Sequence, residues 1–183
     1  MTEEMIVKYC SPTLAGLKTG NMFSYFGFSE ESLLTEIRKI NRCLRVKGVR
    51  LIPMKKQENR VLLYLYRPNK LKKDLENESV KRILQDHGYE NNHSTCCIAK
   101  LIKKIKENSE FPHEIGLFLG YPPEDVAGFI NNKACNCKCV GCWKVYGDEK
   151  KALKTFKEYE KCTKIYCEQW KGGKSLEYLC VAG

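Results

Sequence analysis

Apolar residues recur every three or four positions in several parts of the chain, which is the spacing of one helix face. The clearest case begins after Ser29 and ends at Gly48, so a serine N-cap and a glycine stop frame the pattern. Its apolar positions are Leu33, Leu34, Ile37, Ile40 and Leu44. We therefore predict an amphipathic helix whose apolar face lies in the core.

Other segments predict further helices from their end signals. Ser11 followed by Pro12 is typical of a helix start, with Ser11 as the N-cap and Cys10 just before it. Asp148 can cap a long final helix that ends at Gly172-Gly173. The remaining predicted helices span residues 71–75, 79–87, 95–108 and 122–132.

Three segments have the composition of strands. Residues 49–54 and 60–66 are separated by a polar stretch, as in an antiparallel hairpin with a longer loop, and residues 114–119 form the third. The run "VLLYLY" is apolar on both faces, so we expect it to be central and covered on both sides. The elements predict one α+β domain over residues 1–183, with a small, mainly antiparallel sheet surrounded by helices. A cysteine-rich loop, residues 134–147, precedes the long last helix.

Composition indicates the cellular compartment of this domain and the redox state of its cysteines. A chain of 183 residues is long enough to bury a core without disulfides, and the eleven cysteines are an odd number. The N-terminus lacks the features of a signal peptide, and no window approaches the roughly 20 apolar residues of a membrane span. We therefore expect a cytoplasmic protein with no membrane association, in which clustered cysteines are reduced and serve as metal ligands or catalytic groups.

The formal net charge of +10 raises the question of nucleic-acid binding. Many of the lysines, such as Lys100, Lys103 and Lys104, are interleaved with core positions of a predicted helix, and no nucleic-acid motif is present. We therefore expect no nucleic-acid partner. An anionic ligand or an acidic protein partner remains open.

Four cysteines lie within eight residues, spaced C-x-C-x-C-x2-C from Cys135 through Cys137 and Cys139 to Cys142. The "CVGC" turn favours Cys139 and Cys142 as a chelating pair for zinc or an iron–sulfur cluster. Cys135 and Cys137 can supply the other ligands. A loop that cycles between dithiol and disulfide, or one with inert thiols, is the alternative.

Cys162 and Cys167 are a second source of ligands for the Cys139–Cys142 pair. On one continuous helix, residues five apart point about 140° away from each other, so the two cannot both reach one ion. Cys162 alone can join the pair, with Cys135 or Cys137 as the fourth ligand.

Cys10 and His113 form a candidate catalytic pair. A cysteine at a helix N-terminus favours the thiolate, and "HEIGLFLGYP" is similar to the histidine-bearing strand of papain-like folds, particularly the bacteriocin-processing peptidases. Asp125 and Asn131 are candidates to orient the histidine, but both fall in a predicted helix, and the expected oxyanion-hole glutamine is absent. Glu114 can equally pair with a lysine.

The whole chain resembles a bacterial family labelled domain of unknown function 3793, found mainly in anaerobic Firmicutes. The matching segments are "CSPTLAGLKTGNMF", "KGVRLIP", "LLYLYRP", "FPHEIGLFLGYPPEDVAGFI" and "CKCVGCWKVYGD". The resemblance implies a cytoplasmic single-domain protein with a role in iron or electron handling, with flavodoxin as a possible acidic redox partner. It favours Cys139, Cys142 and Cys162 as ligands.

The leading hypothesis is a cysteine-thiolate metal-binding protein in iron or redox metabolism. A cysteine-nucleophile hydrolase or transferase that uses Cys10 and His113 is the alternative, and a basic module that binds an acidic protein such as flavodoxin is the third. Whether the protein is an enzyme stays open at this point.

Overall fold

The computed structural model describes residues 3–91, 93–108 and 110–183. Contacts along the chain group into two compact units, which are described separately. Unit 1 comprises Met1–Asn69 and Tyr159–Gly183, and unit 2 comprises Lys70–Glu158. The helices and the antiparallel sheet confirm the predicted α+β class. The expectation of a single domain stays a prediction.

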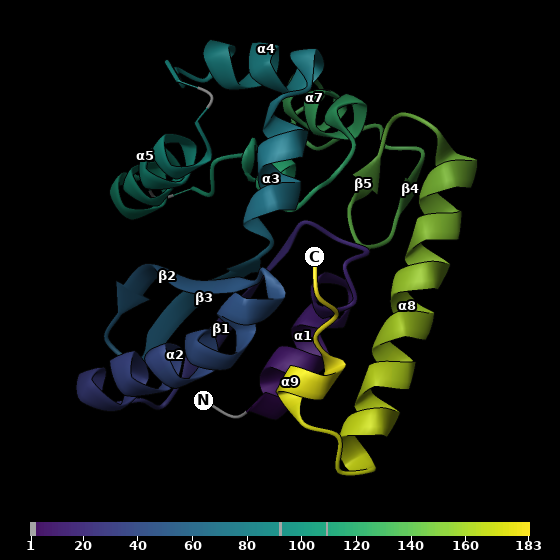
Figure 1. The fold of residues 1–183 in the computed structure, drawn as a ribbon. Helices are drawn as coiled ribbons and strands as arrows, with labels where there is room; N and C mark the ends of the chain where they lie inside the picture. Colours follow the sequence, from purple (N-terminus) through teal and green to yellow (C-terminus); the bar gives the residue numbers. More distant parts are fainter. Residues whose placement is uncertain (1–2, 92, 109) are drawn as a thin grey trace. The chain divides into compact units, whose positions relative to one another are not determined.

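The described part of unit 1 contains a three-stranded antiparallel sheet in the order β1 (Gly20–Phe26), β3 (Arg60–Tyr66) and β2 (Arg50–Gln57) (Figure 1). The strand β3 is central, as its sequence predicted. Both of its faces are buried, because Leu62 and Tyr64 on one face and Leu63 and Leu65 on the other are all at most 8% exposed. The predicted hairpin of β2 and β3 is confirmed, with a register shift between Pro53 and Lys55.

One face of this sheet carries the apolar core of unit 1. Side chains of β3, namely Val61, Leu63 and Leu65, join one buried cluster with residues of α1 (Glu3–Leu14), α2 (Glu30–Leu44) and α9 (Leu176–Leu179). The predicted start of α2 after Ser29 is confirmed, whereas the α-helix itself ends at Leu44, before the predicted stop at Gly48. Ser29 accepts a hydrogen bond from the backbone N–H of Ser32, and Gly48, at φ +74°, follows the short 3-10 helix η1 (Arg45–Lys47).

The predicted helix start at Ser11-Pro12 is wrong, because both residues lie in the last turns of α1. The Ser11 hydroxyl donates to the Val7 carbonyl, one turn earlier. Ile6, Val7, Cys10 and Leu14 form a buried stripe at helical spacing. Burial of this stripe outweighs the single backbone hydrogen bond that Pro12 removes from the helix.

The strand β1 is absent from the strands that the sequence predicted. The strand pairs with β3 along its whole length, from Gly20 opposite Tyr66 to Phe26 opposite Arg60. Buried and exposed side chains do not alternate regularly along β1, because only Gly20 and Phe23 are buried. Gly20 allows the strand to approach the sheet closely, since a Cβ there would lie 2.4 Å from the ring of Tyr64.

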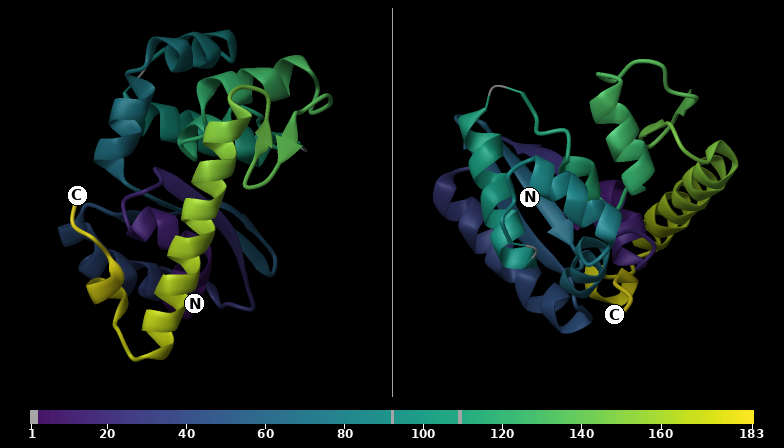
Figure 2. Two further views of the ribbon diagram at one scale, coloured as in Figure 1. Left: turned by 90° about the vertical axis from the view of Figure 1, so that its right-hand side faces the viewer. Right: turned by 90° about the horizontal axis from the view of Figure 1, so that it is seen from above.

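Unit 2 is mostly helical, with a short hairpin near its end. Its elements are most of α3 (Pro68–Leu75), then α4 (Glu78–Asp86), α5 (Ser94–Glu107), α6 (Ile115–Phe118), α7 (Pro123–Asn131), β4 (Cys139–Val140), β5 (Lys144–Val145) and the first part of α8 (Glu149–Lys171). The hairpin β4–β5 lies beside α7 in both views of Figure 2. Among the described residues, no helix is both long and apolar enough to cross a membrane.

The predicted strand at residues 114–119 is wrong, because this segment forms the short helix α6. An apolar run of this length does not distinguish a buried strand from a buried helical turn. Just before α6, the buried Glu114 carboxylate accepts hydrogen bonds from the Lys104 ammonium and the Tyr89 hydroxyl. The expected pairing of Glu114 with a lysine is therefore confirmed.

Candidate functional site

The cysteine loop, residues 134–147, lies between α7 and α8 and contains the hairpin β4–β5. Lys133, Ala134 and Asn136 adopt left-handed conformations, with φ of 47°, 62° and 58°. These are the only non-glycine residues with positive φ in the described chain, and they flank Cys135. Such conformations cost of order 1 kcal/mol each and persist where the surroundings impose them, often at functional sites. The backbone is therefore bent tightly around the first two thiols.

Two lysines hold this loop in place through backbone carbonyls. The Lys144 ammonium donates to the carbonyl of Ala134 at 2.7 Å, and the Lys138 ammonium donates to the carbonyl of Gly147. The Lys138 backbone N–H also donates to the carbonyl of Val145 at 2.8 Å. The two ends of the loop are thus tied to the hairpin.

Asp125, on α7, is buried and anchors the hairpin to the helix. One carboxylate oxygen accepts the indole N–H of Trp143 at 2.7 Å, and the other accepts the backbone N–H groups of Tyr146 and Gly147, each at 2.7 Å. The predicted role of Asp125 in orienting His113 is not supported, because both oxygens serve the loop. Asn131, the second candidate, is exposed at the end of α7.

The pKa values of two groups in the loop, the Cys139 thiol and the Tyr146 hydroxyl, are raised. Cys139 is hydrogen-bonded to the Glu149 carboxylate; burial raises the pKa of this thiol, and Glu149, Cys137 and Asp125 raise it further. Burial also raises the pKa of Tyr146, with Cys137 and Cys135 adding to the effect. Cys137 contributes to both of these pKa shifts.

The Tyr146 hydroxyl is a buried polar atom without a hydrogen-bond partner in the described structure. Its ring packs so closely on α7 that a Cβ at Gly128 would lie 2.4 Å from it. A buried hydroxyl without a partner is costly, so its persistence calls for an explanation. The thiols of Cys135 and Cys137 add to the rise in the pKa of Tyr146. A metal ion bound by these thiols would place a thiolate acceptor near the Tyr146 hydroxyl.

Cys142 has different neighbours from Cys139. It is exposed in the hairpin turn, where its carbonyl accepts a hydrogen bond from the Tyr121 hydroxyl at 3.1 Å. Burial raises the pKa of Tyr121 to about 12, and Cys142 adds to this shift. Within residues 3–91, 93–108 and 110–183, no group of three or more His, Cys, Asp or Glu side chains is arranged to hold a metal ion.

Cys162 and Cys167 lie in unit 1, on the later turns of α8. The helix is continuous, as expected, so the two thiols point in different directions. Cys162 is buried, and burial raises its pKa to about 11, whereas Cys167 packs against the core of unit 1. The role of Cys162 as a metal ligand stays a prediction.

Cys10 and His113 have surroundings that differ from those predicted. Cys10 lies inside α1 and not before a helix N-terminus; it is fully buried, which raises the pKa of its thiol well above its usual range, although Lys18 lowers it slightly. His113 is exposed in the turn that precedes α6. Its ring meets that of Phe129 edge-on, with centroids 5.1 Å apart. The two residues belong to different units.

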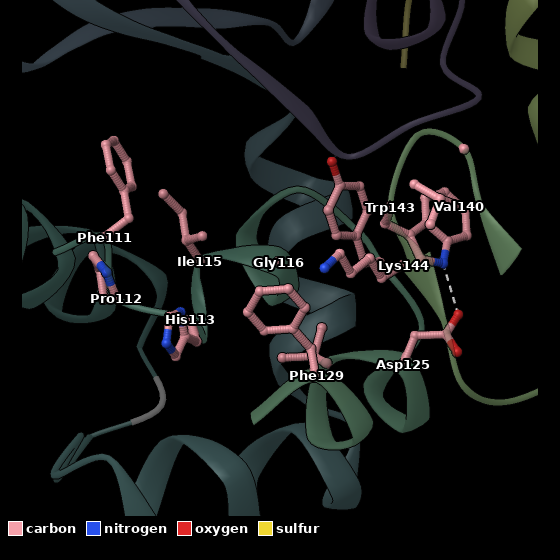
Figure 3. A pocket seen from close by; sticks show the side chains of 13 residues that line it. Phe111, Pro112, His113, Ile115, Gly116, Asp125, Phe129, Val140, Trp143 and Lys144 are labelled. Atoms are coloured by element: carbon pink, nitrogen blue, oxygen red, sulfur yellow. Dashed lines mark hydrogen bonds between the residues drawn. The ribbon is translucent and has the colours of Figure 1, made fainter. Parts of the chain in front are cut away.

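His113 borders a cavity of about 420 Å³ that sequence reasoning missed (Figure 3). The walls come from the segment before α6, from α6 and α7, and from the hairpin, and they are mostly aromatic and aliphatic. Its lining includes Phe111, Ile115, Tyr121, Phe129, Trp143 and Lys144. A signal was present in the sequence, because "FPHEIGLFLGYPPEDVAGFI" and "CKCVGCWKVYGD" concentrate aromatic residues.

The fold defines an α+β protein whose second unit combines a cysteine loop and an aromatic cavity. The chain belongs to the family described as "Protein of unknown function (DUF3793)", whose family model matches residues 6–180. This membership confirms the resemblance found in the sequence. No curated protein and no solved structure matches the chain.

Proposed function

We propose that the protein binds a metal ion through the thiolates of the cysteine loop. The observation that carries this proposal is the crowding of Cys135, Cys137 and Cys139 in one tightly bent loop that also contains the buried, unpartnered Tyr146 hydroxyl. Thiolates and a carboxylate are ligands that zinc accepts in a tetrahedral site. The left-handed residues beside Cys135 support a loop shaped for binding.

Binding would exchange protons for the metal. The Cys139 thiol, now hydrogen-bonded to Glu149, would lose its proton, and both groups could then serve as ligands. The Tyr146 hydroxyl would gain a thiolate acceptor, the kind of contact that orients metal ligands. Three thiolates and one carboxylate favour zinc, whereas participation of Cys142 or Cys162 as a fourth thiolate would permit an iron–sulfur cluster.

The test is metal analysis and a visible absorption spectrum on anaerobically purified protein. We expect about one equivalent of zinc or of a cluster, and a loss of affinity of at least about tenfold in Cys139→Ser. Cys96→Ser is the matched control, because Cys96 is exposed on α5 and should leave binding unchanged. Folded protein that binds neither zinc nor an iron–sulfur cluster would contradict the proposal.

Two further variants decide which ligands complete the site. Glu149→Gln should weaken zinc binding if the carboxylate is the fourth ligand. Cys142→Ser and Cys162→Ser should weaken it if a fourth thiolate is used, and the spectrum then distinguishes zinc from an iron–sulfur cluster. These results separate the donor sets without relying on any enzymatic activity.

We also propose an acidic redox protein such as flavodoxin as a partner, in keeping with a cytoplasmic role in iron or electron handling. The support is a row of exposed cations on α2 and η1, namely Arg38, Lys39, Arg42 and Arg45, within a chain of net charge +10. Such contacts weaken as salt is added. Flavodoxin binding that is absent at low salt, or unchanged in Arg38→Glu/Arg42→Glu, would contradict it.

A catalytic Cys10 receives no support from its surroundings. A nucleophilic cysteine needs a lowered pKa and access to substrate, whereas Cys10 is fully buried and its pKa is raised. The rate at which iodoacetamide labels Cys10 in the folded protein tests this alternative directly.

A further inference from the structure

We propose that the aromatic cavity of unit 2 binds a small, flat aromatic molecule that carries one acidic group. The site is separate from the proposed metal ligands and lies between α6, α7 and the hairpin β4–β5. Its volume of about 420 Å³ falls in the range of small-molecule pockets, roughly 300–1,000 Å³. The class of ligand follows from the aromatic side chains that form the cavity walls and from the charged side chains that border it.

The walls present aromatic rings from several directions. Tyr121 and Trp143 lie with ring centroids 4.9 Å apart, and Phe156 braces Trp143 edge-on at 4.5 Å. Across the cavity, Figure 3 places Phe129 next to His113. Aromatic pairs favour offset and edge-on contacts, so a flat ring can join this arrangement without displacing it. The walls therefore suit a planar aromatic body.

The charges favour a negative group on that body. Asp125 also borders the cavity, but its carboxylate oxygens are occupied by Trp143, Tyr146 and Gly147. The Lys144 ammonium lies 5.9 Å from the centroid of Phe129 and donates one hydrogen bond to Ala134. An ammonium has three N–H donors, so it can also bind an acidic group. Lys144 therefore supplies the charge complement.

The side chains that border the cavity and that of Cys139 lie on opposite faces of the hairpin. Successive side chains of a strand point to opposite faces. Val140 and Lys144, which are paired across the hairpin, border the cavity, whereas the next pair, Cys139 and Val145, is absent from its lining. Ligand binding in the cavity is therefore testable in the metal-free protein.

The first experiment uses anilinonaphthalene sulfonate, an aromatic anion whose fluorescence rises in an apolar site. We expect one saturable site, and at least about tenfold weaker binding in Val140→Trp, because the larger side chain fills the cavity. Val140 is 67% exposed, so the change is compatible with folding. Val46→Trp is the matched control, since Val46 is 74% exposed in unit 1. Equal binding by both variants, or no saturable site, would overturn the proposal.

The second experiment tests the acidic group. Lys144→Met should weaken binding of the sulfonate about tenfold but leave binding of the uncharged analogue N-phenylnaphthylamine within about twofold. Lys138→Met is the control, because Lys138 also holds a loop carbonyl but does not border the cavity. If both lysine variants weaken the sulfonate equally, or if neither does, the assigned role of the Lys144 charge is wrong.

Discussion

The carboxylate of Asp125 accepts a 2.7 Å hydrogen bond from the indole Nε1 of Trp143, and both residues are buried. This contact joins α7 to the hairpin β4–β5. The same carboxylate accepts the backbone N–H groups that follow the hairpin, so a single side chain positions both the wall of the cavity and the exit from the cysteine loop. The two proposed sites consequently depend on one anchor.

Replacing this anchor should destabilise unit 2. Asp125→Asn removes the negative charge, and the amide can present only one oxygen to three N–H donors. We expect a loss of about 2 kcal/mol in the free energy of unfolding, the typical value for hydrogen bonds to a charged group. Denaturant unfolding followed by fluorescence measures it. Asp148→Asn is the control: Asp148 is an exposed helix cap, and Asn caps equally well, so stability should change little.

Arg67 should be equally important in unit 1. Its buried guanidinium donates to the carbonyls of Thr13 and Leu14 at the end of α1, at 2.7 and 2.6 Å, and to Val181 at 2.7 Å. Arg67→Met takes the charged donor away from all three carbonyl acceptors, two of which are buried, so we expect a loss of about 3 kcal/mol. Thermal or denaturant unfolding gives the value.

Arg60→Met is the matched control for Arg67. Arg60 is exposed and donates a single hydrogen bond to the Ser24 hydroxyl. Its loss should change stability by no more than about 0.5 kcal/mol. Similar losses in the two variants would show that the buried network around Arg67 is not what stabilises unit 1.

The rate at which each cysteine reacts with a thiol reagent should depend on the burial and the pKa of its thiol. The thiolate is the reactive form, so iodoacetamide should label the exposed Cys96, Cys135 and Cys142 first and the buried Cys10 last. Cys162, whose pKa is raised to about 11, should be mostly protonated near neutral pH and should react faster as the pH rises toward that value. Peptide mapping by mass spectrometry measures each rate.

Denatured protein is the reference for this labelling, since all thiols should then react at similar rates. Rapid and selective labelling of Cys10 in the folded protein would contradict its buried, neutral state. It would restore the cysteine-nucleophile alternative.

Tyr146→Phe should have opposite effects on stability and on metal affinity. Without metal, removal of a buried hydroxyl that has no partner should leave stability unchanged or raise it by up to about 1 kcal/mol. With metal, it should weaken zinc binding by about tenfold if the hydroxyl donates to a thiolate ligand. Thermal unfolding and zinc titration on the same variant measure the two effects.

Tyr121→Phe provides the comparison, because the Tyr121 hydroxyl donates to the Cys142 carbonyl. Its removal should therefore lower stability without metal. If Tyr146→Phe also lowers stability of the metal-free protein, the hydroxyl has a partner in solution and its link to the metal proposal fails.

The elements that the sequence predicted well are those with local signals. The helix α2 lies between Ser29 and Gly48, and α8 follows the Asp148 cap, because caps and stops act on backbone groups within a few residues. The central position of β3 followed from its apolar character on both faces. The strand β1 was missed because its pairing with β3 involves residues about 40 positions away in sequence.

The sequence by itself determined the α+β class, most helix boundaries, the central strand and the crowding of thiols before the last helix. Only the tertiary structure decided that residues 115–118 are helical, that Cys10 is buried inside α1, and that Cys139 and Cys142 have different neighbours. It also revealed the aromatic cavity. The physical reason is that caps and periodicity act over a few residues, whereas burial, buried hydrogen bonds and cavities arise between segments that are distant in sequence.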